Sequence, residues 1–175
     1  MSRISSKYLD LQKKLHENPN YGVASIGIAS AVKDFFQAGK FGSISDYGAG
    51  KRNLYHALTN LGLKNFKYFA YDPVFPEYGP PQPADLVCCI DVLEHIEEAF
   101  LEKVLEDLEK ITIKIGFFTI ATGPAEKILA DGRNAHLIQK PSSWWLMKLC
   151  KRFEIEHLQK NPDGFLIIVK AKSLA

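Results

Sequence analysis

The spacing of apolar residues changes from a helical to a strand-like pattern near residue 40. Upstream, apolar side chains at helical intervals predict helices over residues 5–17 and 21–37. Downstream, short apolar runs predict strands at 43–47, 66–71, 86–90 and 114–122. Helical patterns separate the first of these strands from the second, and the third from the fourth. A helix from Pro141 to about residue 151 then precedes two closing strands, 153–158 and 165–172, joined by the turn Asn161-Pro162-Asp163-Gly164.

Strands that alternate with helices are typical of a parallel α/β sheet, and the closing hairpin adds an antiparallel edge to it. Ligands of such sheets bind at the carboxyl ends of the strands. Candidate functional residues should therefore directly follow each strand. The length of 175 residues suits a single domain with one sizeable core.

Composition and charge are those of an ordinary globular protein, with 46% hydrophobic and 24% charged residues. A net charge of +2 does not indicate a nucleic-acid partner, although it does not exclude a local basic patch. The sequence has three cysteines without zinc-type spacing, no secretory signal and no apolar run of about 18 residues. These features predict a cytoplasmic protein without a membrane partner, and they leave the oligomeric state open.

The strongest local signal is the segment Asp46-Tyr47-Gly48-Ala49-Gly50, between a predicted strand and a predicted helix. Its glycines permit a tight turn and the close approach of a ligand to the backbone. Asp46 can accept a hydrogen bond from an ammonium group but would repel a pyrophosphate, so a zwitterionic ligand is expected. Asp72 follows the next strand, 22 positions after Gly50, where a carboxylate can bind both ribose hydroxyls of a nucleoside. Alone, Asp46 could be a helix cap and Asp72 a turn residue, but together they favour a ligand site.

With these residues the chain resembles the class I, Rossmann-like S-adenosylmethionine-dependent methyltransferases. A further segment, residues 84–96, is similar to the motif around that family's fourth strand, and the resemblance spans about residues 21–171. It implies a three-layer sandwich formed by residues 41–175, with helices of residues 1–40 covering the cofactor cleft. It also implies the following contacts with S-adenosylmethionine: Tyr21, Gly48 and Gly50 at the methionine portion, Asp72 at the ribose, and Asp91 and Val92 nearby.

One departure from this family is large. Between Asp72 and Asp85 the family has a helix, a strand and another helix, whereas this chain has twelve residues, five of which are prolines. Such a density of proline prevents a helix, and a helix–strand–helix unit needs about 30 residues. One edge strand and its flanking helices should therefore be missing. Val74 and Phe75 are the candidates to cover the adenine in their place.

A second candidate site follows the strand at 86–90. Asp91, Glu94 and His95 stand at positions i, i+3 and i+4, so a helix that begins at Asp91 would place them on one face. Two carboxylates and an imidazole suit either a divalent metal ion or acid–base catalysis. Alternatively, Glu94 is a favourable charge at a helix N-terminus and His95 a packing residue.

The run from Asp91 to His95 is similar to the ExxEH element of two methyltransferase groups. These are the ubiquinone-biosynthesis O-methyltransferases and the small-RNA 2′-O-methyltransferases. In both groups this element and a later histidine bind a divalent metal beside the acceptor hydroxyl. The resemblance implies Mg²⁺ or Mn²⁺ held by Asp91, Glu94, His95 and His136, although the first glutamate is here the shorter Asp91.

The predicted function is O-methylation of a small hydroxylated acceptor, with the catalytic residues His95, His136 and Glu94. N-methylation stays open. A nicotinamide dehydrogenase is disfavoured because Asn53 stands where GxGxxG requires its third glycine. The alternative from another class is a non-catalytic module that binds the cofactor or a protein through a degenerate methyltransferase fold. The remaining histidines, His16, His56 and His157, are expected to be surface or helix-face residues without a role.

Overall fold

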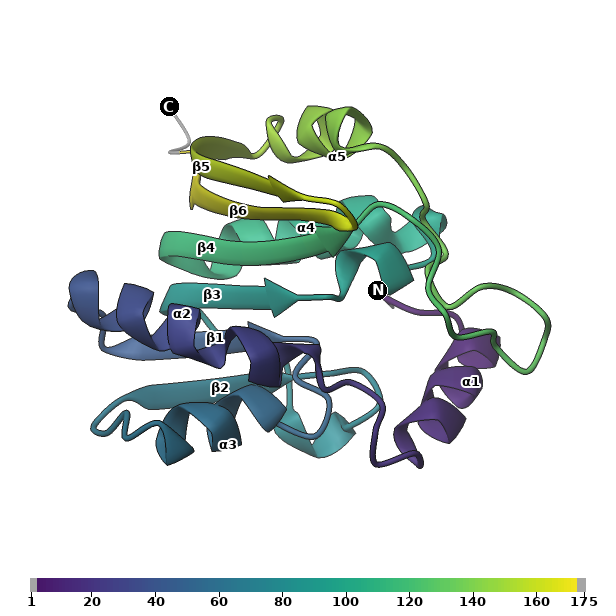
Figure 1. Cartoon of the computed structure of the whole chain (residues 1–175), viewed down its shortest axis with the longest axis horizontal. Helices are drawn as coiled ribbons and strands as arrows, with labels where there is room; N and C mark the ends of the chain where they lie inside the picture. Colours follow the sequence, from purple (N-terminus) through teal and green to yellow (C-terminus); the bar gives the residue numbers. More distant parts are fainter. Residues whose placement is uncertain (1–2, 173–175) are drawn as a thin grey trace.

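Six strands form a sheet in the computed structural model, which describes residues 3–172. They are β1 (Ser43–Tyr47), β2 (Lys67–Tyr71), β3 (Ala84–Ile90), β4 (Thr112–Ala121), β5 (Phe153–Asn161) and β6 (Gly164–Ala171). Their order across the sheet is β2-β1-β3-β4-β6-β5 (Figure 1). The first four strands are parallel, and β6 lies antiparallel between β4 and β5. The predicted mostly parallel sheet with an antiparallel C-terminal hairpin is confirmed.

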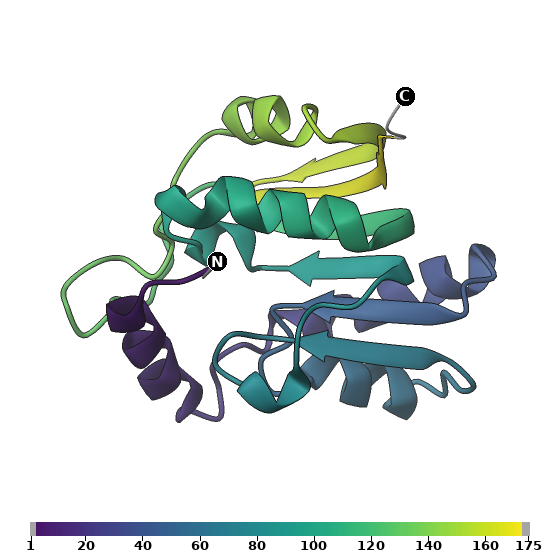
Figure 2. The ribbon, with the colours of Figure 1, turned by 180° about the vertical axis from the view of Figure 1, so that it is seen from behind.

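Helices cover both faces of this sheet and give the predicted three layers (Figures 1 and 2). One layer contains α2 (Ala24–Ala38) and α3 (Asn53–Asn60), and the other contains α4 (Glu98–Ile111) and α5 (Ser142–Leu149). On α4, Leu101, Val104, Leu105 and Leu108 are all buried against the sheet, because residues three and four apart share one helix face. The two apolar cores hold β3 between them, so its carboxyl end is fixed in position.

Helix α1 (Ser6–His16) belongs to neither layer and lies beyond the carboxyl ends of the parallel strands (Figure 1). It begins where the Ser5 hydroxyl accepts the Tyr8 N–H, an N-cap that satisfies one of the free donors of the first turn. Its buried side chains are Tyr8 and Gln12, which are four residues apart on one face. None of the helices within residues 3–172 combines the length and apolar character needed to span a membrane.

The connection from β2 to β3 confirms that the chain lacks an edge unit, because β2 itself is the edge strand. The connection contains a single 3₁₀ turn, η1 (Pro76–Tyr78), and no α-helix. Pro76 occupies the first position of that turn, where a missing N–H costs nothing. The segment passes over the sheet on the same side as α4 (Figure 2).

Candidate functional site

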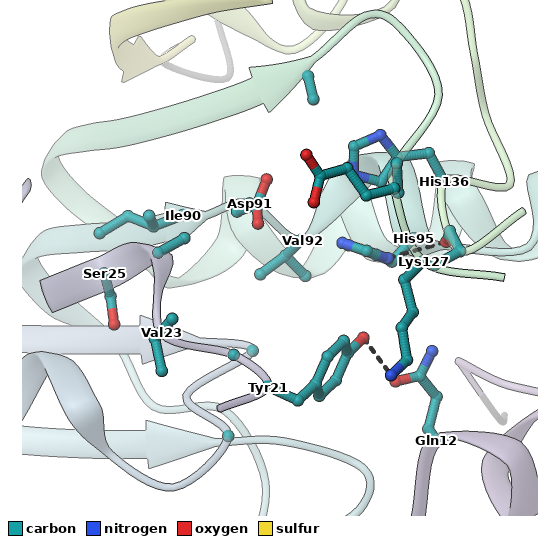
Figure 3. A pocket seen from close by; sticks show the side chains of 18 of the residues that line it. Gln12, Tyr21, Val23, Ser25, Ile90, Asp91, Val92, His95, Lys127 and His136 are labelled. Atoms are coloured by element: carbon teal, nitrogen blue, oxygen red, sulfur yellow. Dashed lines mark hydrogen bonds between the residues drawn. The ribbon is translucent and has the colours of Figure 1, made fainter. Parts of the chain in front are cut away.

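A cleft of about 990 Å³ opens at the carboxyl ends of the parallel strands, which is where a doubly wound sheet binds its ligands. It is lined by the residues that follow β1, β3 and β4, with α1 and residues 21–25 on another side (Figure 3). The predicted cofactor residues Tyr21, Asp46, Gly48, Gly50, Asp72, Asp91 and Val92 all line this cleft. The structure therefore brings together residues that are up to 71 positions apart in the printed sequence, from Tyr21 to Val92.

The loop after β1 requires glycine at position 48. Gly48 has a positive φ of 81°, and a Cβ atom there would lie 2.4 Å from Cγ2 of Val92. The backbone N–H groups of Gly48 and Ala49 both donate to the carbonyl of Tyr71, at 2.8 and 2.9 Å. These bonds fix the loop to the end of β2, and the side chain of Val92 packs against the loop at Gly48.

Asp72 lies where this loop meets the end of β2, with only 8% of its surface exposed. Its carboxylate accepts the Gly50 N–H at 2.9 Å and the Val74 N–H at 2.8 Å. These two bonds orient the carboxylate, and each oxygen keeps a second lone pair for a ligand hydroxyl. Burial raises the pKa of Asp72, and the two backbone donors oppose that shift.

Asp46 is buried at the end of β1 and is 4% exposed. The Tyr68 hydroxyl donates a short hydrogen bond to its Oδ2. Burial raises the pKa of Asp46 to about 7, with the negative charge of Asp72 adding to the rise and the Tyr68 bond opposing it. A cation placed beside a buried carboxyl of this kind favours its ionised form and lowers its pKa again.

Three side chains form a potential metal site: ligand atoms of Asp91, His95 and His136 all lie within 4.8 Å of one another. The Nδ1 atom of His95 is 2.8 Å from the Ala135 carbonyl, and Nδ1 of His136 is 2.7 Å from the Gly123 carbonyl. Carbonyl oxygens only accept, so in both rings Nδ1 carries the proton and Nε2 keeps its lone pair. Figure 3 shows Asp91, His95 and His136 on the same side of the cleft, across from Tyr21.

His95 is neutral in this environment. Burial lowers its pKa, and the neighbouring Asp91 carboxylate opposes that effect. Its ring meets that of His136 edge to face, with 4.8 Å between the ring centres. His95 therefore presents an unprotonated Nε2, as either a proton acceptor or a metal ion requires.

The prediction of a helix that begins at Asp91 is wrong. Asp91 has a positive φ of 57°, a 3₁₀ turn η2 (Leu93–His95) follows, and α4 begins only at Glu98. Asp91 therefore lies outside the turn, and within the turn the neighbouring side chains of Glu94 and His95 point in directions about 120° apart. Glu94 is fully buried, its Oε1 accepts the Ala121 N–H at 2.6 Å, and burial raises its pKa well above the usual range. Glu94 does not line the cleft and lies outside the cluster of Asp91, His95 and His136, although its carboxyl interacts with that of Asp91.

His16, which was expected to be a surface or helix-face residue without a role, lies on a face of α1 that borders the cleft. His16 lines the cleft, and its ring meets those of Tyr21 and Phe75 edge to face at 5.1 and 5.3 Å. Burial, with a smaller contribution from the charge of Lys51, lowers the pKa of His16 to about 4. The spacing Tyr8, Gln12, His16 puts all three on one helix face, which is the sequence signal that could have identified it.

A chain of hydrogen bonds connects this helix face to the histidine pair. The Tyr21 hydroxyl donates to Oε1 of Gln12 at 3.2 Å (Figure 3). Nε2 of Gln12 donates to the Tyr8 hydroxyl at 2.6 Å. The Tyr8 hydroxyl in turn donates to the backbone carbonyl of His95 at 2.8 Å. Helix α1 is therefore fixed across the mouth of the cleft.

Comparisons with known proteins bear on the fold. No protein-family model and no curated protein matches the sequence. Among solved structures, the chain is similar to the PH0226 protein from Pyrococcus horikoshii OT3, with a TM-score of 0.63, 11% identity, and coverage of 96% of this chain and 100% of that one.

Two similar structures are methyltransferases by name. One is the 1,6-didemethyltoxoflavin-N1-methyltransferase from Burkholderia thailandensis with bound 1,6-didemethyltoxoflavin and S-adenosylhomocysteine, with a TM-score of 0.64, 12% identity, and coverage of 99% of this chain and 93% of that one. The other is the mitomycin 7-O-methyltransferase MmcR, with a TM-score of 0.67, 13% identity, and coverage of 93% of this chain and 60% of that one. The predicted Rossmann-like methyltransferase fold is confirmed.

Proposed function

We propose that this protein is an S-adenosylmethionine-dependent methyltransferase that acts on a hydroxyl group of a small molecule. The observation that carries the proposal is the convergence of Asp46, Gly48 and Asp72 at one end of a cleft whose other end holds the histidine pair His95 and His136. The residues fit the cofactor: the buried carboxylate of Asp46 suits its ammonium group, and Asp72 suits its ribose. Structures of the same fold include an N-methyltransferase and an O-methyltransferase.

Bound S-adenosylmethionine would supply a methyl group that is already strongly electrophilic. The protein then has to orient an acceptor hydroxyl, exclude water and remove a proton. Nε2 of His95 has the lone pair for this last role, because Nδ1 is committed to the Ala135 carbonyl. His136, which comes from the loop after β4, offers a second such atom on the same side of the cleft.

Cofactor binding is the first test. Calorimetry with S-adenosylmethionine should show binding to the wild-type protein, and Asp72→Asn should weaken it by about tenfold or more through the lost charge-assisted bonds to ribose. Asp34→Asn makes the same chemical change at an exposed position and should leave the affinity unchanged.

Incubation with cell extract and methyl-labelled S-adenosylmethionine should then yield a labelled small molecule. Wild-type protein that fails to bind the cofactor would contradict the proposal and favour a module that binds a protein partner.

We further propose that Asp91, His95 and His136 bind a divalent metal beside the acceptor. Both imidazoles donate Nδ1–H to a backbone carbonyl, the arrangement that orients histidine ligands in metal sites. Two nitrogens and one carboxylate favour Mn²⁺ over Mg²⁺, since Mg²⁺ prefers oxygen ligands. The ion would act as a Lewis acid toward the acceptor oxygen.

Titration with Mn²⁺, followed by the electron paramagnetic resonance signal of the free ion, tests the metal site without an activity measurement. The wild-type protein should remove one equivalent of free Mn²⁺, and Asp91→Ala should weaken this binding by about tenfold or more. His56→Ala, at an exposed histidine of α3, is the matched control. An undiminished Mn²⁺ signal with wild-type protein would rule out the metal and leave His95 or His136 as a base.

A further inference from the structure

The residues before α1, Arg3 to Ser5, are held by hydrogen bonds to α4 and to the residue before it. The Arg3 guanidinium forms two hydrogen bonds with the Asp107 carboxylate on α4, at 2.5 and 3.0 Å. The N–H and hydroxyl of Ser5 both donate to the carboxylate of Glu97, at 2.8 and 2.7 Å. Together with the bond from Tyr8 to the His95 carbonyl, these contacts hold the segment against the start of α4.

A recess of about 80 Å³ lies under this segment. Ile4 and Tyr8 line it from the N-terminal segment, Pro73 and Val74 from the proline-rich connection, and Val92 and Ile96 from the stretch after β3. The rings of Tyr47 and Tyr71, which pack with 4.7 Å between their centres, also line it. The polar and charged residues of the lining are Arg3, Gln12, His16, Asp72, His95 and Glu97. Most of these groups are apolar or aromatic, as in sites for flat ring systems.

Asp72 stands at the boundary between the recess and the main cleft, since it lines both, as do Gly48 and Val92. A ribose held by Asp72 has its two substituents on opposite ends of the sugar ring. One substituent reaches the main cleft, where Asp46 suits the ammonium group of a methionine arm. The base on the other end is then directed into the recess.

We infer that this recess binds the adenine of the cofactor, with the N-terminal segment as its wall in place of the missing edge unit. The inference rests on the proposed function. Phe75, the other residue expected to cover adenine, is already stacked on Tyr78 at 5.3 Å with 11° between the ring planes. Val74 lines the recess from the proline-rich connection, and Ile4 lines it from the N-terminal segment.

The substitution Ile4→Trp tests this inference, because the larger side chain is expected to fill the recess of about 80 Å³. S-adenosylhomocysteine and S-ribosylhomocysteine, which lacks the base, serve as the two probes, measured by calorimetry and saturation-transfer NMR. Ile4→Trp should weaken S-adenosylhomocysteine binding by about tenfold or more and leave S-ribosylhomocysteine binding within about twofold. Val74→Trp, from another wall, should do the same. Lys14→Trp adds the same bulk at an exposed position of α1 and should change neither affinity.

Thermal unfolding identifies the variants that fold. If Ile4→Trp does not fold, the affinities of Val74→Trp test the inference. Wild-type affinity for S-adenosylhomocysteine in a folded recess variant would overturn the inference. Equal losses for both ligands would also overturn it, because the effect would not concern the base. Wild-type protein that binds neither ligand would instead contradict the proposed function.

Discussion

Asp46→Asn is expected to stabilise the ligand-free protein at neutral pH and at the same time to abolish most of its cofactor binding. Burial raises the pKa of Asp46 from 3.8 to about 7, so the fold favours the protonated carboxyl. A pKa that is higher in the folded state contributes stability that is complete below pH 3.8 and is lost as the pH rises through about 7. The loss at pH 7.5 is on the order of 4 kcal/mol at most. Asparagine avoids it, while its amide oxygen can still accept the hydrogen bond from Tyr68.

The same change removes the charge that an ammonium group requires. A buried charge pair that loses one partner costs about 2–5 kcal/mol, so the affinity for S-adenosylmethionine should fall by about 30-fold or more. Wild-type affinity should itself decrease as the pH falls below about 7, where Asp46 becomes protonated.

Thermal unfolding at pH 5 and pH 8, combined with calorimetry, measures both effects. The stability advantage of Asp46→Asn should be small at pH 5 and larger at pH 8. Asp34→Asn should show neither effect, because Asp34 is exposed. If Asp46→Asn is less stable than the wild type at pH 8, then burial does not raise the pKa of Asp46 in the way described. If the variant binds the cofactor as well as the wild type does, then Asp46 is not the ammonium site.

The position of the site could be predicted from the sequence because it depends on the ends of strands. Parallel strands bring their carboxyl ends to one edge of the sheet, so Asp46, Asp72 and Asp91 had to meet once the strands were recognised. The missing edge unit was equally predictable, since the prolines between β2 and β3 prevent any long helix.

The composition of the cluster formed by Asp91, His95 and His136 was not predictable in the same way. The chain has a short 3₁₀ turn at η2 in place of a helix from Asp91, and Glu94 does not line the cleft. The choice depends on Ala121, whose N–H binds the buried Glu94 carboxyl, and on the left-handed backbone of Asp91. Neither contact has a local sequence signal.

The placement of α1 depends on contacts that are distant in the sequence. Its face with Tyr8, Gln12 and His16 is regular, but the pattern alone does not say what the face covers. Its position is set by pairs such as Arg3 with Asp107, which are 104 residues apart. A single sequence gives no indication of such a pair, and for this reason the sequence did not place His16 at the cleft.

Replacement of His95 should reduce methyl transfer by about 100-fold or more while the affinity for S-adenosylhomocysteine stays within about twofold. His95→Asn is the informative change. The asparagine Nδ2 can donate to the Ala135 carbonyl as the His95 Nδ1 does, whereas the lone pair of Nε2 is lost. A loss of activity then reports the chemistry of Nε2 and not a displaced loop. His56→Asn, at an exposed position of α3, should retain full activity.

His136→Asn preserves the bond to the Gly123 carbonyl in the same way and allows the two roles of the pair to be separated. If both histidines bind one metal ion, either single replacement should reduce the rate about as much as the double replacement, because groups that act as a unit are not additive. If His95 is a base and His136 only orients the acceptor, His95→Asn should cause the larger loss, and the double variant should lose more activity than either single variant. Rates that are unchanged in both single variants would show that neither histidine takes part in methyl transfer.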